Sequence, residues 1–106
     1  MIRIEATRGE TVRVEWFFTD LGVNETSIHT SHIAIEVRSE TGRAVRLNNI
    51  QGGVLANVAK KRVWSDIKTE GLQSGVHQVW ITVVKRDGSE TRKLTHVVVV
   101  TEARMA

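Results

Sequence analysis

The chain has 106 residues and no cysteine, and its 15 basic and 12 acidic residues give a formal net charge of +3. This length is typical of one domain with one hydrophobic core, so we expect a single domain over residues 1–106. Without cysteine the chain can form no disulfide, thiol nucleophile or thiolate zinc site. The basic residues are scattered apart from Lys60-Lys61-Arg62, so we do not expect a nucleic-acid partner.

The sequence contains no run of about 18 apolar residues, so we expect no membrane span. Its first five residues, Met1-Ile2-Arg3-Ile4-Glu5, alternate apolar and charged side chains and lack the apolar region of a secretory signal. The sequence therefore predicts a protein without a signal peptide, located in the cytoplasm or built into a larger particle.

Apolar residues recur at every second position along most of the chain, which is typical of half-buried strands. A short strand is expected over 2–7, followed by a turn at Arg8-Gly9-Glu10 and a long strand. One face of that long strand carries the apolar residues Val12, Val14, Trp16 and Phe18. Residues 20–27 contain Gly, Asn, Thr and Ser, which indicates a loop.

A hairpin is predicted next, because Ile33, Ile35 and Val37 alternate with polar residues up to Glu40-Thr41-Gly42. A three-residue loop needs a left-handed residue at its third position, and Gly42 supplies it. Pairing Ser39 with Arg43 then places Val37 opposite Val45 and Ile35 opposite Leu47, so turn and apolar pattern give the same register.

The middle of the chain, 48–74, gives the weakest pattern. Residues 54–59 fit either a strand or a helical turn, and residues 62–67 fit a strand. The polar stretch from Thr69 to Gly75 indicates a loop.

Two long β-rich runs, 76–85 and 90–101, flank Asp87-Gly88, the favoured pair for a type I′ turn. That turn places Lys85 opposite Glu90 and Ile81 opposite Leu94. One face, which we assign to the core, then carries Val79, Ile81, Val83, Leu94 and Val98. The other carries Gln78, Trp80, Thr82, Lys93, Thr95 and Val97. About seven such strands without a convincing helix predict an all-β sandwich or small barrel.

The sequence shows no serine elbow, phosphate loop, zinc-protease motif or paired carboxylates, so we expect neither an enzyme nor a cofactor. His29 and His32 would point to opposite faces of a strand, which is poor geometry for one metal. His77 and His96 become diagonal neighbours on one face. They could form a pH-sensitive or metal-binding pair, but we favour two partly buried residues that close the core.

The tryptophans are the candidate contact residues. Trp16 alternates with core positions and is expected to be interior. Trp80 lies on the face opposite the assigned core, beside Val97, where it is either a contact hot spot or covered by the domain itself. Trp64 follows the basic cluster Lys60, Lys61 and Arg62 and is either part of a ligand patch or, as we favour, a core residue.

The order of these features is similar to a known family. Arg8-Gly9-Glu10-Thr11 leads into a long strand, and Gly75-Val76-His77-Gln78-Val79-Trp80 precedes the Asp87-Gly88 turn. This pattern resembles the immunoglobulin-like N-terminal domain of phage baseplate upper proteins and related small phage virion domains. The chain differs at His77 or Gln78, where an aromatic residue is common, and over 48–61, which has no clear counterpart.

The resemblance implies an immunoglobulin-like antiparallel β-sandwich with a structural or adhesion role in a virion and no catalysis. Its partners would be copies of itself or other virion proteins, bound through Trp80, Trp64 and exposed strand edges. One alternative is a carbohydrate-binding module that uses the exposed tryptophans. Another is a small enzyme or metal protein that uses His77 and His96.

Overall fold

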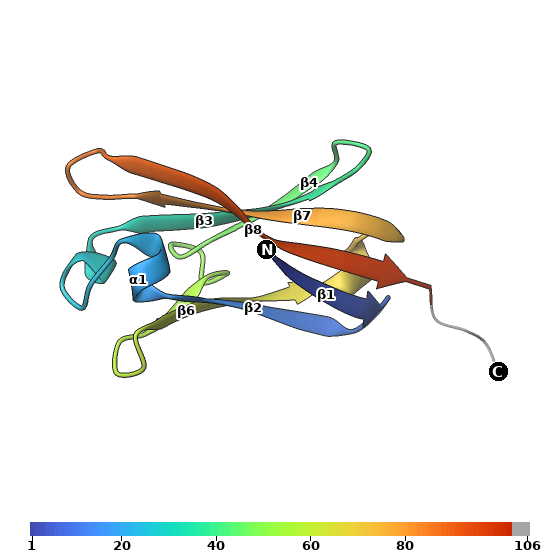
Figure 1. Cartoon of the computed structure of the whole chain (residues 1–106), viewed down its shortest axis with the longest axis horizontal. Helices are drawn as coiled ribbons and strands as arrows, with labels where there is room; N and C mark the ends of the chain where they lie inside the picture. The colour runs from blue at the N-terminus through green and yellow to red at the C-terminus, as the bar shows by residue number, and fades with distance from the viewer. Residues whose placement is uncertain (103–106) are drawn as a thin grey trace.

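The computed structural model describes residues 1–102 and contains two β-sheets stacked face to face (Figure 1). The eight strands are β1 (Ile2–Thr7), β2 (Thr11–Phe17), β3 (His32–Ser39), β4 (Ala44–Asn48), β5 (Leu55–Asn57), β6 (Arg62–Lys68), β7 (Gly75–Val84) and β8 (Glu90–Thr101). One sheet has the order β1-β8-β7-β3-β4 and the other the order β2-β6-β5. The expected all-β sandwich is confirmed.

The strand order is that of an immunoglobulin-like sandwich. Strands β2, β5 and β6 form one sheet, and the other sheet contains the β3–β4 and β7–β8 hairpins together with β1. The first strand adds a variation, because β1 pairs parallel with β8 whereas the other strand pairs of the described chain are antiparallel. The turn after β1 then carries the chain across to β2 in the second sheet.

The core lies between the sheets and follows the period-two pattern of the sequence. In β2 the side chains of Val12, Val14 and Trp16 are buried while those between them are exposed. The prediction that Trp16 is interior is therefore confirmed. Residues 62–67 form part of β6, as predicted, and Val54–Ala59 contains the short strand β5 rather than a helical turn.

The β3–β4 hairpin has the predicted register. Val37 lies opposite Val45, Ile35 lies opposite Leu47, and the backbone N–H of Ser39 donates to the carbonyl of Arg43. Gly42 has a φ of 86°, the left-handed conformation expected at the third loop position.

The β7–β8 hairpin differs from the prediction by one residue near its tip. Val84, not Lys85, lies opposite Glu90, and the Lys85 N–H donates to the Ser89 carbonyl. The loop is therefore three residues long, Arg86–Gly88, and Gly88 takes the left-handed third position with a φ of 87°. Asp87-Gly88 fits this loop as well as a two-residue turn, which is why the sequence pattern gave the wrong register.

A β-bulge in β8 restores the predicted pairing further along the hairpin. Val79 lies opposite His96 while Trp80 lies opposite Leu94, so Thr95 is the extra residue. Leu94 was assigned to the core, and this is wrong because Leu94 shares the outer face with Trp80. Thr95 was assigned to the outer face, and this is also wrong because its hydroxyl accepts a hydrogen bond from the buried Trp16 indole.

Three short helices fill the connections: α1 (Phe18–Leu21) and the 3₁₀ helices η1 (Ser27–His29) and η2 (Thr69–Gly71). Phe18 is buried, as its alternation predicted, but it begins α1 instead of ending a strand. Helix α1 stops at Gly22, whose φ of 67° is left-handed. Of the helices in the described part of the chain, none has the length and apolar character to cross a membrane.

Candidate contact surfaces

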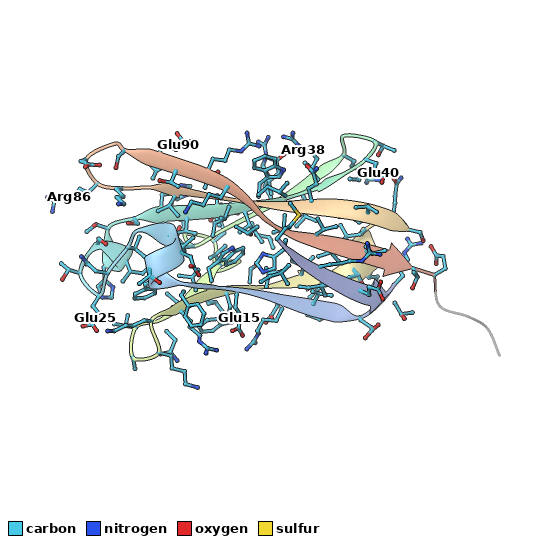
Figure 2. The ribbon with its side chains drawn as sticks, viewed as in Figure 1. Glu15, Glu25, Arg38, Glu40, Arg86 and Glu90 are labelled. Carbon is cyan, nitrogen blue, oxygen red and sulfur yellow. The ribbon has the colours of Figure 1, made fainter. Side chains whose placement is uncertain are left out.

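The predicted contact residues lie on opposite outer faces of the sandwich. Trp64, Arg62 and the adjoining Lys60 and Lys61 belong to the three-stranded sheet, whereas Trp80 and Val97 belong to the five-stranded sheet. Figure 2 shows the separation, with Glu15 of β2 beside the lower layer and Arg38 of β3 above the upper layer. The structure therefore does not bring these residues together into one site.

The outer face of the three-stranded sheet carries aromatic and charged side chains in alternation. We call it the aromatic–arginine face, and it consists of Arg13, Glu15, Phe17, Leu55, Arg62, Trp64 and Asp66. Strand pairing places Glu15 of β2 directly opposite Trp64 of β6, with Leu55 of β5 on the other side of that tryptophan. Phe17 and Leu55 are 53% and 46% exposed, so the face presents two large apolar side chains to solvent.

Each arginine on this face contacts both a carboxylate and an aromatic ring. The guanidinium of Arg13 donates to both carboxylate oxygens of Asp66, at 2.9 and 3.2 Å, and lies 5.5 Å from the centre of the Trp64 ring. These hydrogen bonds lower the pKa of Asp66 below its ordinary value. Such paired contacts hold the side chains in fixed positions and so reduce the entropy lost when a partner binds.

The second arginine repeats the arrangement at the other end of the face. Arg62 donates to Glu15 at 3.2 Å, and its guanidinium carbon lies 5.0 Å from the centre of the Phe17 ring. Nearby, Lys61 lies 3.8 Å from Glu25. Lys61 also has a φ of 53°, a left-handed conformation that bends the chain sharply before β6.

The expectation that Trp64 is a core residue is wrong. Val63, Ser65 and Ile67 take the buried positions of β6, so Trp64 between them points outward. Ser65 can occupy a buried position because its hydroxyl donates to the Gly53 carbonyl at 2.6 Å. The Trp64 indole N–H is shielded from solvent and has no hydrogen-bond partner within residues 1–102.

Trp80 points outward from the five-stranded sheet, as predicted, but it is half-buried by its neighbours. Its indole N–H donates to Gln78 at 3.1 Å, and the guanidinium carbon of Arg92 lies 4.6 Å from its ring centre. Leu94 lies opposite it, and Val97 lies further along β8 opposite Gln78. The domain's own side chains therefore cover much of this tryptophan.

His77 and His96 are buried, at 2% and 3% exposure, as we favoured for residues that close the core. Each has its own partner. His77 Nε2 donates to the Gln73 carbonyl at 2.6 Å, which leaves His77 Nδ1 as an acceptor with no donor. His96 Nδ1 lies 2.7 Å from the Thr95 hydroxyl, and its ring packs edge-on against Trp16. Burial lowers the pKa of His96 below its ordinary value.

Within residues 1–102, no three His, Cys, Asp or Glu side chains lie close enough together to bind a metal ion. His29 and His32 are exposed, one in η1 and the other at the start of β3.

No protein-family model and no curated protein matches the chain.

The sequence patterns identify two members of the aromatic–arginine face, Arg62 and Trp64, and miss the other five, namely Arg13, Glu15, Phe17, Leu55 and Asp66. Period-two alternation does place Arg13 and Phe17 opposite the buried side of β2, so an outward phenylalanine was the available signal. Leu55 had no such signal, because β5 is only three residues long.

Proposed function

We propose that this chain is a non-enzymatic protein-contact module and that the aromatic–arginine face is its contact surface, with a second copy of the chain as the first partner. Trp and Arg are the residue types most enriched at the energetic centres of protein interfaces. Here Trp64, Phe17 and two arginines lie side by side on a rigid sheet. Lys60 and Lys61 lie in the adjoining loop and extend the surface.

The arginines on the aromatic rings favour a protein partner over a carbohydrate. A sugar stacks on a bare ring face, but guanidinium groups lie over the outward rings of Phe17, Trp64 and Trp80 at 4.6 to 5.5 Å. A guanidinium in this position can still donate to carbonyl or carboxylate groups of a protein. The position of these guanidinium groups over the outward aromatic rings is the observation that carries the proposal.

The face is also electrically self-complementary. Its two arginines are balanced by Glu15 and Asp66, so two copies can meet without net repulsion and exchange ion-pair partners across a two-fold axis. Strands of seven residues give a face about 23 Å long and only about 10–15 Å wide. That is below the size of a standard interface, so we expect weak association.

A weak contact of this kind suits an assembly in which many copies are held close together, because a high effective concentration compensates for low affinity. The sequence resemblance supports such a setting in a phage or prophage virion, as an accessory of tail, baseplate or capsid. The immunoglobulin-like strand order is compatible with that placement.

Sedimentation equilibrium over a range of concentrations tests the proposal. We expect reversible self-association with a Kd of roughly 0.1–1 mM. Arg62→Ala and Trp64→Ala should weaken it about tenfold or more, whereas the matched changes Arg92→Ala and Trp80→Ala on the other sheet should leave it unchanged. Circular dichroism spectra confirm that each variant is folded.

Two results would overturn the proposal. One is a monomer at about 1 mM, or association that responds to Trp80→Ala and not to Trp64→Ala. The other is glycan-array binding that disappears in the Trp64→Ala variant, which would establish the carbohydrate-binding alternative.

A further inference from the structure

The three-stranded sheet has an open backbone edge along half of β6. Strand β5 pairs only with Arg62, Val63 and Trp64, so the rest of β6, 65–68, has a strand neighbour on the β2 side alone. Ser65 is held by its side-chain bond to Gly53, which leaves Asp66 to Lys68 as the free edge. Unpaired edges of this kind can accept an additional strand.

A cleft of about 330 Å³ lies along this edge, between β6 and β4 of the other sheet. The side chains of Val45 and Leu47 enter it from β4, and Ile67 and Leu72 line it from the other side. Val45 is 39% exposed although it occupies an inward position of its strand, because no strand of the smaller sheet lies beneath it. The cleft therefore offers apolar contacts at alternate positions beside an open backbone.

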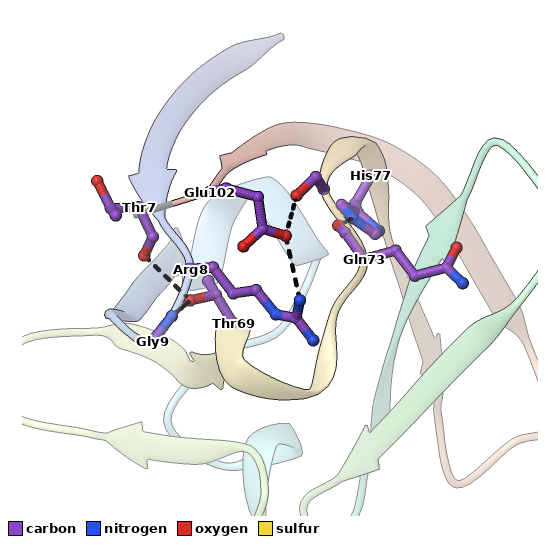
Figure 3. Close-up of polar contacts among 8 residues, drawn as sticks. Thr7, Arg8, Gly9, Thr69, Gln73, His77 and Glu102 are labelled. Carbon is purple, nitrogen blue, oxygen red and sulfur yellow. Dashed lines mark hydrogen bonds and ion pairs between the residues drawn. The ribbon is translucent and has the colours of Figure 1, made fainter. Parts of the chain in front are cut away.

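The wall formed by η2 is fixed by a set of hydrogen bonds (Figure 3). The Thr69 hydroxyl accepts from the Gly9 N–H at 3.0 Å and donates to the Glu10 carbonyl at 2.6 Å. Beyond this wall, Gln73 accepts the hydrogen bond from the buried His77 ring. These contacts make the cleft a preformed feature of the fold, so a ligand would not have to order it.

Two basic side chains are available to a ligand here, Lys68 in the lining of the cleft and Arg43 beside it. Arg43 and Lys68 make no ion pair within residues 1–102, whereas the carboxylate of Asp66 is already paired with Arg13. Arg43 also borders a cavity of about 10 Å³ that reaches His77, whose Nδ1 has no donor. This end of the cleft can therefore receive a carboxylate beside Arg43, and the small cavity has room for no more than one water molecule next to His77.

We propose that this cleft binds an extended segment of a partner protein, which pairs with residues 66–68 and continues the line of β5. The segment has apolar side chains at alternate positions, directed towards Val45, Leu47 and Ile67, and an acidic residue near Lys68 or Arg43. The open stretch of β6 has room for about three paired residues, or about 10 Å of strand. This edge site adjoins the aromatic–arginine face at Asp66 but uses the inward side of β6, and it does not depend on self-association on the outer face.

A peptide titration followed by amide NMR tests the proposal. The probe is an acetylated peptide, Asp-Val-Thr-Val-Thr-Val-Asp, and its counterpart carries lysine in place of both aspartates. We expect shift changes on 65–68 and 44–48, cross-strand contacts to β6, and binding of the acidic peptide about fivefold tighter than that of its counterpart.

Paired variants locate the binding. Val45→Glu and Arg43→Glu should weaken it about tenfold, whereas Ile2→Glu and Arg86→Glu, on exposed positions elsewhere, should not. The proposal is overturned if the acidic peptide at about 1 mM causes no shifts at the cleft, or if Val45→Glu binds it as well as wild type. It is also overturned if Val45→Glu abolishes self-association, because a second copy would then be the occupant.

Discussion

Replacement of Thr69 by valine tests whether one buried hydroxyl joins the first turn of the chain to the wall of the cleft. Thr69 is fully buried at the start of η2. Its hydroxyl donates to the carbonyl of Glu10 and accepts from the N–H of Gly9, and its own N–H donates to the same carbonyl at 3.1 Å. Valine has nearly the same shape and cannot form the two side-chain hydrogen bonds.

The expected loss follows from those two bonds. A typical intramolecular hydrogen bond contributes about 1 kcal/mol, and an unpaired buried group costs more, so we expect Thr69→Val to lower the free energy of unfolding by about 2 kcal/mol. For a domain of this size that corresponds to a fall in Tm of about 10 °C. The third bond, from the Thr69 backbone, remains and limits the loss.

Urea unfolding of wild type, Thr69→Val and Thr69→Ser measures the effect. Serine keeps the hydroxyl and loses one buried methyl group, so it should cost only about 1 kcal/mol. The reasoning fails if valine is as stable as wild type, or if serine is the more destabilising of the two. Either outcome would mean that packing rather than hydrogen bonding holds the turn.

Three further predictions concern the core. The pKa of His96 is lowered by burial, so the unfolded chain takes up a proton at this residue at a higher pH than the folded chain does. The contribution of His96 to the free energy of unfolding should therefore be complete above about pH 6.5 and decrease below it. His96→Phe should remove that decrease in urea titrations between about pH 5 and 7. Gly53→Ala should cost about 1–3 kcal/mol in the same assay, because its new Cβ would lie 2.9 Å from the Leu47 Cβ. Trp16→Phe should cost about 2–3 kcal/mol through the lost indole bond to Thr95 and the smaller ring, with near-UV circular dichroism to check the fold.

The fold class could be predicted because the period-two pattern and the turn residues agree along most of the chain. At Gly42 both signals specify the same pairing, and the hairpin of Val37 and Val45 follows. At Asp87-Gly88 the turn chemistry allows two loop lengths, and the wrong one shifts the pairing by a residue. The bulge at Thr95 cancels that shift, and a bulge leaves little trace in a sequence.

The candidate site was harder to predict because it depends on which side of a strand faces outward. Trp64 stands between Val63 and Ser65, and hydrophobicity alone favours burying the tryptophan. The structure buries Ser65 instead, since a hydrogen bond to Gly53 satisfies its hydroxyl there. That contact joins segments 12 residues apart, so local sequence patterns could not reveal it. The same holds for Leu55, whose strand could not be distinguished from a helical turn.

The unequal sheets explain why the proposed edge site lies between β6 and β4. Five strands cannot be covered by three, so inward side chains near the margins of the larger sheet keep exposure that a balanced sandwich would remove. Val45 on β4 retains 39% exposure and Ile2 on β1 retains 57%, although both strands place them towards the core side. The β4 margin also adjoins the part of β6 that β5 leaves unpaired, and Arg43 and Lys68 beside it make no ion pair within residues 1–102. A strand added at β6 would therefore supply the cover that β5, at three residues, is too short to give.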